Sequence, residues 1–302
     1  MITLLLIVLL IAYFCFHQAF YASRRPPKVQ EEFPMPPGEV YEPYHPVMRQ
    51  WMREVREMPF RPMEITSFDG LKLSAKYYET KPGAPIGLMF HGYRGNAERD
   101  LCGGVQRAFA LGHNVVLADQ RTAGNSEGKV ITFGINESKD CLFWVEHLIE
   151  VFGPEVQIIL TGISMGAATV VLAAGQPLPP QVLGVLADCG YSSAKEMIQK
   201  TIAEMHLPPK AAYPFVKLGA RLFGRFRLEE DSPQEAILRC TVPVLFFHGD
   251  ADDFVPCEMS ERLYALCPTK KKLVIVPGAG HGLAYPADPE QYLTEMRGFF
   301  HD

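Results

Sequence analysis

The strongest hydrophobic pattern in the sequence lies at the start of the chain. Residues 2–16 are almost entirely aliphatic or aromatic, and apolar character continues to Ala22, with His17 and Gln18 as polar interruptions. About 20 such residues in a helix are enough to cross the hydrocarbon core of a bilayer. The pattern therefore predicts one transmembrane helix over residues 1–23.

A cleaved signal peptide is the alternative for this segment. Signal peptides carry basic residues before the apolar run and a small-x-small cleavage site, and residues 1–23 have neither feature. An uncleaved anchor is therefore favoured. Because Arg24, Arg25 and Lys28 follow the run, the positive-inside rule predicts a single-pass protein of the cell membrane with its catalytic domain in the cytoplasm.

Residues 24–60 have a different pattern. Prolines crowd the first part of this segment, which predicts an extended, semi-rigid spacer. From Val47 to Met58 apolar residues recur at helical spacing, which predicts a short helix packed on the domain surface, with a membrane-surface helix as the alternative. A protein that begins near Val47 is accordingly expected to be soluble and active.

Residues 61–302 alternate between strand-like and helix-like patterns. Helical stretches near 97–111, 136–151, 165–175, 257–267 and 289–301 separate the later strands. Asp69-Gly70 joins the first two strands as a hairpin. This order predicts a mostly parallel eight-stranded sheet with helices on both faces. The predicted strands are Ile65–Phe68, Leu71–Tyr78, Ile86–His91, Val115–Asp119, Val156–Gly162, Leu183–Asp188, Val242–His248 and Lys272–Val276.

A long helical segment interrupts this alternation after Asp188. Roughly fifty residues precede the next strand, whereas a crossover needs only about a dozen. The surplus predicts a helical cap at about 192–235. Its apolar side chains, with Phe215 and Leu222 as examples, are expected to bind an acyl chain.

Composition excludes several classes of function. The formal net charge of -5 supplies no basic stripe for nucleic acid. The seven cysteines include no CxxC pair, and none lies near a histidine at zinc spacing. No metal, cofactor or disulfide framework is expected.

Candidate chemistry centres on a G-x-S-x-G motif at residues 162–166. A strand precedes Ser164 and a helix follows it, which is the setting of a sharp turn that exposes a nucleophilic serine. His281 follows the last predicted strand and is the candidate base. Asp250, Asp252 and Asp253 follow the preceding strand, and one of them must orient the imidazole.

These motifs resemble the α/β-hydrolase superfamily, and in particular bacterial membrane-anchored serine hydrolases similar to the S33 peptidase and esterase group. The resemblance runs from about Glu64 to Phe300 and implies an α/β-hydrolase fold. It assigns Asp252 as the acid, and Tyr93 and Met165 as backbone donors of an oxyanion hole. The loop at residues 119–128 also matches, although Thr122 replaces the family's glycine.

The predicted function is hydrolysis of a carboxylic ester or thioester through an acyl-serine intermediate, with Ser164, Asp252 and His281 as the triad. The substrate is expected to be a small-molecule or lipid-like acyl ester. An S33-like peptidase is the alternative, with Glu196, Glu204, Glu229 or Glu230 of the cap as candidate binders of a peptide amine. A non-catalytic binding module on the same fold is a further alternative.

Overall fold

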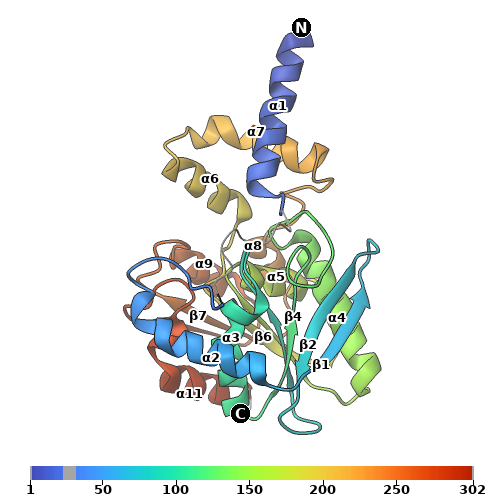
Figure 1. The fold of residues 1–302 in the computed structure, drawn as a ribbon, viewed down its shortest axis with the longest axis vertical. Helices are drawn as coiled ribbons and strands as arrows, with labels where there is room; N and C mark the ends of the chain where they lie inside the picture. Colours follow the sequence, from blue (N-terminus) through green and yellow to red (C-terminus); the bar gives the residue numbers. More distant parts are fainter. Residues whose placement is uncertain (1, 23–31, 301–302) are drawn as a thin grey trace.

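A computed structural model describes residues 2–22 and 32–300, and an eight-stranded sheet forms its centre (Figure 1). The strand order is β1-β2-β4-β3-β5-β6-β7-β8, with β1 and β2 antiparallel to their neighbours and the other pairs parallel. This arrangement confirms the predicted α/β-hydrolase fold. The strands are β1 Arg61–Thr66, β2 Lys72–Tyr78, β3 Ile86–Phe90, β4 Asn114–Ala118, β5 Ile158–Ile163, β6 Val182–Asp188, β7 Val244–Gly249 and β8 Lys271–Val276.

Helices cover both faces of the sheet because its central strands are apolar on both faces. In β3, Leu88 and Phe90 pack in one core cluster and Met89 in another on the opposite face. Helices α4 (Ile135–Phe152), α5 (Met165–Ala174) and α9 (Glu258–Leu266) cover the first face, and α3 (Ala97–Ala110) and α11 (Pro289–Phe300) the second. The remaining short helices are η1 Glu42–Tyr44, η2 Ile237–Arg239 and α10 Ala284–Ala287.

Two elements at the edge of the domain, β1 and α2, have bounds that differ from those predicted from the sequence. Strand β1 begins at Arg61 and includes Pro62, which is tolerated because β1 is an edge strand. Helix α2 (His45–Glu57) packs against α3 and buries Met52 and Val55. It is a helix on the domain surface, as the sequence favours.

The cap follows β6, at the position where the sequence predicts an insertion. It contains α6 (Ala194–Glu204), α7 (Pro209–Leu222) and α8 (Pro233–Ala236), and the chain then returns to the sheet at β7. Figure 1 shows α6 and α7 standing above one end of the sheet. The cap therefore covers the edge at which the parallel strands end.

Helix α1 (Ile2–Ala19) projects from the cap end of the molecule (Figure 1). Its first half is exposed, with Leu4 at 67% and Leu10 at 67%. Its second half packs against α7, where a Cβ on Gly219 would lie 2.4 Å from the Ala12 carbonyl oxygen. With a mean hydropathy of 2.2, α1 has the length and composition of a membrane span or of a signal sequence. Residues 24–31 of the predicted spacer lie outside the described residues.

Candidate active site

Ser164 occupies the sharp turn between β5 and α5. Its backbone lies in the left-handed region, at φ 56° and ψ −118°. The flanking glycines are needed because a Cβ on Gly162 would lie 2.1 Å from the Gly166 carbonyl oxygen, and one on Gly166 would lie 2.0 Å from that of Phe90. This crowding presses the turn against β3 and presents the Ser164 side chain at the carboxyl edge of the sheet, as the motif predicts.

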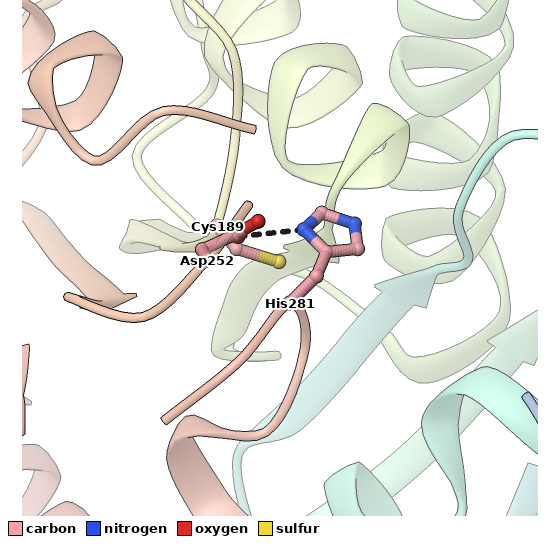
Figure 2. A group of neighbouring side chains, drawn as sticks. All are labelled: Cys189, Asp252 and His281. Carbon is pink, nitrogen blue, oxygen red and sulfur yellow. Dashed lines mark hydrogen bonds and ion pairs between the residues drawn. The ribbon is translucent and has the colours of Figure 1, made fainter. Parts of the chain in front are cut away.

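Asp252 and His281 meet at the same edge of the sheet. His281 Nδ1 lies 2.7 Å from Asp252 Oδ2, and Figure 2 shows this contact as a dashed line. The other carboxylate oxygen, Oδ1, accepts hydrogen bonds from the amides of Phe254 (3.0 Å) and Val255 (2.8 Å). His281 also lines a pocket together with Ser164. The structure therefore pairs Asp252 with His281, and it places His281 and Ser164 in the lining of one pocket.

A second histidine stands behind Asp252. His248 is fully buried, and its Nε2 lies 3.2 Å from Asp252 Oδ2 while its Nδ1 lies 2.7 Å from Ser260 Oγ. Burial by itself would raise the pKa of Asp252, but hydrogen bonds with His248 and His281 outweigh it and hold that pKa well below its usual range. The sequence places His248 at the end of a predicted strand and predicts no role for it at the site.

Cys189 also lies beside Asp252 and His281, as Figure 2 shows. One ligand atom from each of the three residues lies within 4.8 Å of the other two. Burial raises the pKa of the Cys189 thiol well above its usual range.

The two carboxylates that flank Asp252 have different surroundings. Asp250 Oδ1 accepts a hydrogen bond of 2.6 Å from the Gly278 amide, and so braces the loop that carries His281. Asp253 is exposed, and its carbonyl oxygen accepts a bond from Lys200. Asp253 does not cap the next helix, because α9 begins at Glu258 with Cys257 as its N-cap.

The predicted oxyanion loop lies against Ser164. A Cβ on Gly92 would lie 3.5 Å from the Ser164 Cβ, so the backbone of this loop approaches the nucleophile closely. His91 braces the loop, accepting a bond from the Gln120 amide at Nε2. Met165, at the first position of α5, has an amide without an acceptor inside its own helix. These positions fit the predicted donors Tyr93 and Met165.

The same loop holds the end of α1. The Tyr93 hydroxyl donates to the Ala19 carbonyl oxygen at 2.7 Å, and Arg94 donates to the carbonyl of Gln18 at 2.7 Å. The last carbonyls of a helix have no partner inside it, so these side chains supply the missing donors. Helix α1 is thereby joined to the loop beside Ser164.

An apolar pocket of about 170 Å³ opens beside Ser164. Helix α1 forms one wall through Gln18 and Ala19, while Tyr93 and Phe133 belong to the domain below. Neither Phe215 nor Leu222, the predicted acyl-binding residues, lines this pocket, and Leu222 is exposed. The cap contributes Met197, Ile198, Thr201, Ile202, Met205 and Val216 instead.

Part of the predicted spacer also reaches the site. The Tyr41 hydroxyl donates to the His281 carbonyl oxygen at 3.0 Å, and Tyr41 and Pro36 line the pocket shared by Ser164 and His281. A protein beginning near Val47 would lack these contacts and the α1 wall. The structure therefore favours loss of activity on such a truncation, contrary to the sequence expectation.

Other polar residues named from the sequence lie outside the reacting group. Asp119 accepts a bond from the Asn125 amide at 3.0 Å and braces its loop. Arg121, in the same loop, forms a buried ion pair with Asp140 at 2.7 Å. The four cap glutamates each pair with a cation: Glu196 with Arg262, Glu204 with Lys200, Glu229 with Lys217 and Glu230 with Lys139.

The sequence is similar to a known protein family and to several known proteins. Residues 88–295 match a family model described as the alpha/beta hydrolase family. The chain is 32% identical over 190 residues to the uncharacterized protein YqkD of Bacillus subtilis, a match that spans 63% of this chain and 62% of that relative's length. It is 27% identical to protein bem46 of Schizosaccharomyces pombe over 75% of this chain and 70% of that protein.

Solved structures share the fold. The Pyrococcus furiosus esterase Pf2001 superposes with a TM-score of 0.66 at 21% identity, covering 89% of this chain and 96% of that one. Est1E from Butyrivibrio proteoclasticus, solved with ferulic acid, gives a TM-score of 0.60 at 22% identity over 78% and 97% of the two chains. Hydrolases, including esterases, are thus built on this architecture.

Proposed function

This chain belongs to the alpha/beta hydrolase family, and we propose that it is a serine hydrolase that cleaves a carboxylic ester or thioester. The observation that carries the proposal is the contact of 2.7 Å between Asp252 and His281 in a site that Ser164 shares. A neutral imidazole held by a carboxylate can accept a proton from a serine hydroxyl. The expected intermediate is an acyl ester of Ser164.

In the proposed mechanism, His281 Nε2 removes the proton from Ser164 Oγ as this oxygen attacks the carbonyl carbon. The tetrahedral oxyanion accepts hydrogen bonds from the amides of Met165 and Tyr93, each worth about 3 kcal/mol in the transition state. His281 then protonates the leaving alcohol or thiol. Water repeats the sequence on the acyl-serine, and the low pKa of Asp252 keeps it ionised beside the imidazolium.

The apolar pocket beside Ser164 supports an acyl group over a peptide. Its lining is mostly apolar and includes Met197, Ile198 and Ile202 of the cap. The four cap glutamates, which an aminopeptidase-like site would need, are paired with cations, and none lines this pocket. A medium-length acyl chain fits these surroundings better than a charged peptide end.

We also propose that α1 stays attached as a single-pass anchor in the cell membrane, with the catalytic domain in the cytoplasm. Its first half is apolar and exposed, which suits a lipid environment. Its second half supplies a wall of the pocket and bonds to Tyr93 and Arg94, which a cleaved signal peptide would not provide. The orientation rests on the basic residues after α1.

The test is turnover of p-nitrophenyl esters of increasing chain length by the whole protein in detergent, beside an aminopeptidase substrate. We expect hydrolysis that peaks at medium chains, and a loss of up to about 10⁶ in kcat for Ser164→Ala. Labelling by a fluorophosphonate should vanish in Ser164→Ala and persist in Ser138→Ala, which lines neither pocket. Undiminished labelling of Ser164→Ala would exclude this serine as the nucleophile.

A further inference from the structure

Helix α7 and the turn after it form a basic segment of the cap. Between Met205 and Leu228 the sequence contains no Asp or Glu. The same stretch carries five exposed cations: Lys210, Lys217, Arg221, Arg225 and Arg227. Of these five cations, only Lys217 has an ion-pair partner within the described part of the chain, and that partner is Glu229. Such a concentration of free positive charge suits an anionic surface.

Apolar side chains are exposed on the same part of the cap. Leu222 is 46% exposed and Phe223 is 36% exposed, while Met205 and Leu207 at the end of α6 are more exposed still. The Phe223 ring packs edge-on against Tyr13 of α1, with ring centroids 5.2 Å apart. The apolar surface of α1 therefore continues onto the cap.

The crossing of α1 and α7 fixes the depth of this surface. Ala12 meets Gly219 about 15 Å along the helix axis from Ile2, at 1.5 Å per residue. The part of α1 that precedes this crossing is therefore about half as long as a bilayer core of roughly 30 Å is thick. Lipid that surrounds this exposed part of α1 ends where α7 begins, which places α7 at the boundary of the hydrocarbon region.

We propose that this surface of the cap, consisting of the four apolar residues and five cations named above, lies in the interface of an anionic lipid bilayer. The proposal rests on the proposed anchoring by α1. Exposed Leu and Phe beside Lys and Arg, as at the end of α7, resemble the composition of interfacial helices. Each cation near an anionic leaflet contributes about a fivefold gain in binding.

The consequence for the substrate follows from Met205. This residue is 59% exposed in the apolar surface and also lines the pocket beside Ser164. The mouth of the pocket therefore opens where the cap meets lipid. An acyl ester dissolved in the bilayer can enter along α1 without crossing water, which assigns membrane-borne acyl esters as the substrate class.

Fluorescence quenching by nitroxide-labelled lipids tests the location of the cap. The whole protein is placed in phosphatidylcholine–phosphatidylglycerol vesicles as Leu222→Trp and, as a control, as Val151→Trp, at an exposed position on α4. Wild-type protein gives the background of Trp51 and Trp144. We expect at least threefold stronger quenching at position 222 than at 151. Equal quenching at both positions would overturn the proposal. Protection of the tryptophan at position 222 from quenching that depends only on protein concentration would also overturn it, and would indicate that a second copy of the chain covers this surface.

Removal of positive charge from the cap tests whether the protein prefers anionic lipid. Arg221→Gln with Arg225→Gln is compared with Arg49→Gln and Arg53→Gln on α2, the helix for which a membrane-surface role was the alternative. The rate on a long-chain ester embedded in vesicles is measured with and without phosphatidylglycerol. The ratio of the rate with phosphatidylglycerol to the rate without it is called the anionic advantage. We expect this ratio to fall at least about threefold in the cap variant, Arg221→Gln with Arg225→Gln. The α2 variant, Arg49→Gln with Arg53→Gln, should keep the wild-type ratio.

Retention of the full advantage by the cap pair, or an equal loss in both pairs, would overturn the cap proposal. A soluble acetyl ester separates this result from failure of the proposed function. If wild-type protein does not hydrolyse the acetyl ester, the hydrolase assignment fails. If every variant hydrolyses it at the wild-type rate, the vesicle data test the cap alone.

Discussion

The two sides of the Ser164 site differ in chemistry and in origin. On the sheet side, Ser164, Asp252 and His281 follow β5, β7 and β8, and a hydrogen bond of 2.7 Å joins Asp252 to His281. On the cap side, α1, α6 and α7 present apolar side chains around a pocket. The candidate reacting residues thus lie at the ends of strands in one sheet, whereas the pocket lining comes from segments that are distant in the sequence. We expect changes on the first side to lower the rate for every substrate, and changes on the second to depend on chain length.

Asp252→Asn should produce the largest effect after loss of the nucleophile. The amide would stabilise the wrong tautomer of His281, so kcat should fall by up to about 10⁴. The factor should be the same for acetyl and octanoyl esters, measured by steady-state kinetics. Asp253→Asn, whose side chain is exposed, is the matched control and should change kcat less than twofold. A reversed pattern would reassign the acid.

The same substitution has a predicted dependence on pH. The folded-state pKa of Asp252 is depressed, so its stabilising contribution is present above the unfolded pKa of about 3.9. It is lost as the pH falls further towards the folded-state pKa. The difference in unfolding free energy between wild type and Asp252→Asn should shrink as the pH falls below about 3.9. Urea denaturation measures this difference, and one that grows below about pH 3.9 would contradict the assignment.

Ile198→Ala tests the cap side at a residue that lines the pocket. The substitution removes three carbon atoms from the pocket lining, each worth about 0.8 kcal/mol of buried contact, so kcat/KM for an octanoyl ester should fall by up to about fiftyfold. The acetyl ester should be affected by less than about threefold, since a two-carbon acyl group leaves most of the pocket empty. Leu222→Ala, outside the pocket, is the control in detergent. An equal loss for both esters would argue against acyl binding there.

Tyr93→Phe should have the smallest effect, because it removes one bond that joins the two sides. The ring remains, but the Ala19 carbonyl loses its donor, a change worth about 1 kcal/mol. We expect a fall of about fivefold in kcat with little change in KM, for all chain lengths. A wild-type kcat would show that α1 does not help to position the oxyanion loop.

The sequence predicts the sheet side well because each of its functional residues lies in a short local pattern. The glycines around Ser164 are required by contacts under 2.2 Å that any side chain would violate, so the motif and the geometry are tied together. The continuous apolar runs of the central strands are equally informative, because β3 to β7 are buried on both faces. The choice of Asp252 among three carboxylates came from a family resemblance, and its contact with His281 agrees with it.

The cap side could not be predicted in the same way. Ala19 and Ile198 line one pocket although 179 positions separate them in the chain. Apolar side chains are alike in a pattern whether they face a pocket, a bilayer or the core, which is why Leu222 was misplaced. His248 was missed for a related reason, because a buried histidine behind the acid leaves no spacing signal. Tyr41 lay in a proline-rich stretch whose composition suggested only a spacer.

The contact between Ala12 and Gly219 has a consequence for biosynthesis. Helix α1 leaves the ribosome before its partner α7, which follows about 200 residues later; at 5–20 residues per second this means roughly 10–40 s. Throughout that interval the proposed anchor is held by lipid alone. The cap must then close around a helix that is already inserted, so assembly of the enzyme is expected to finish at the membrane, after translation has passed the cap.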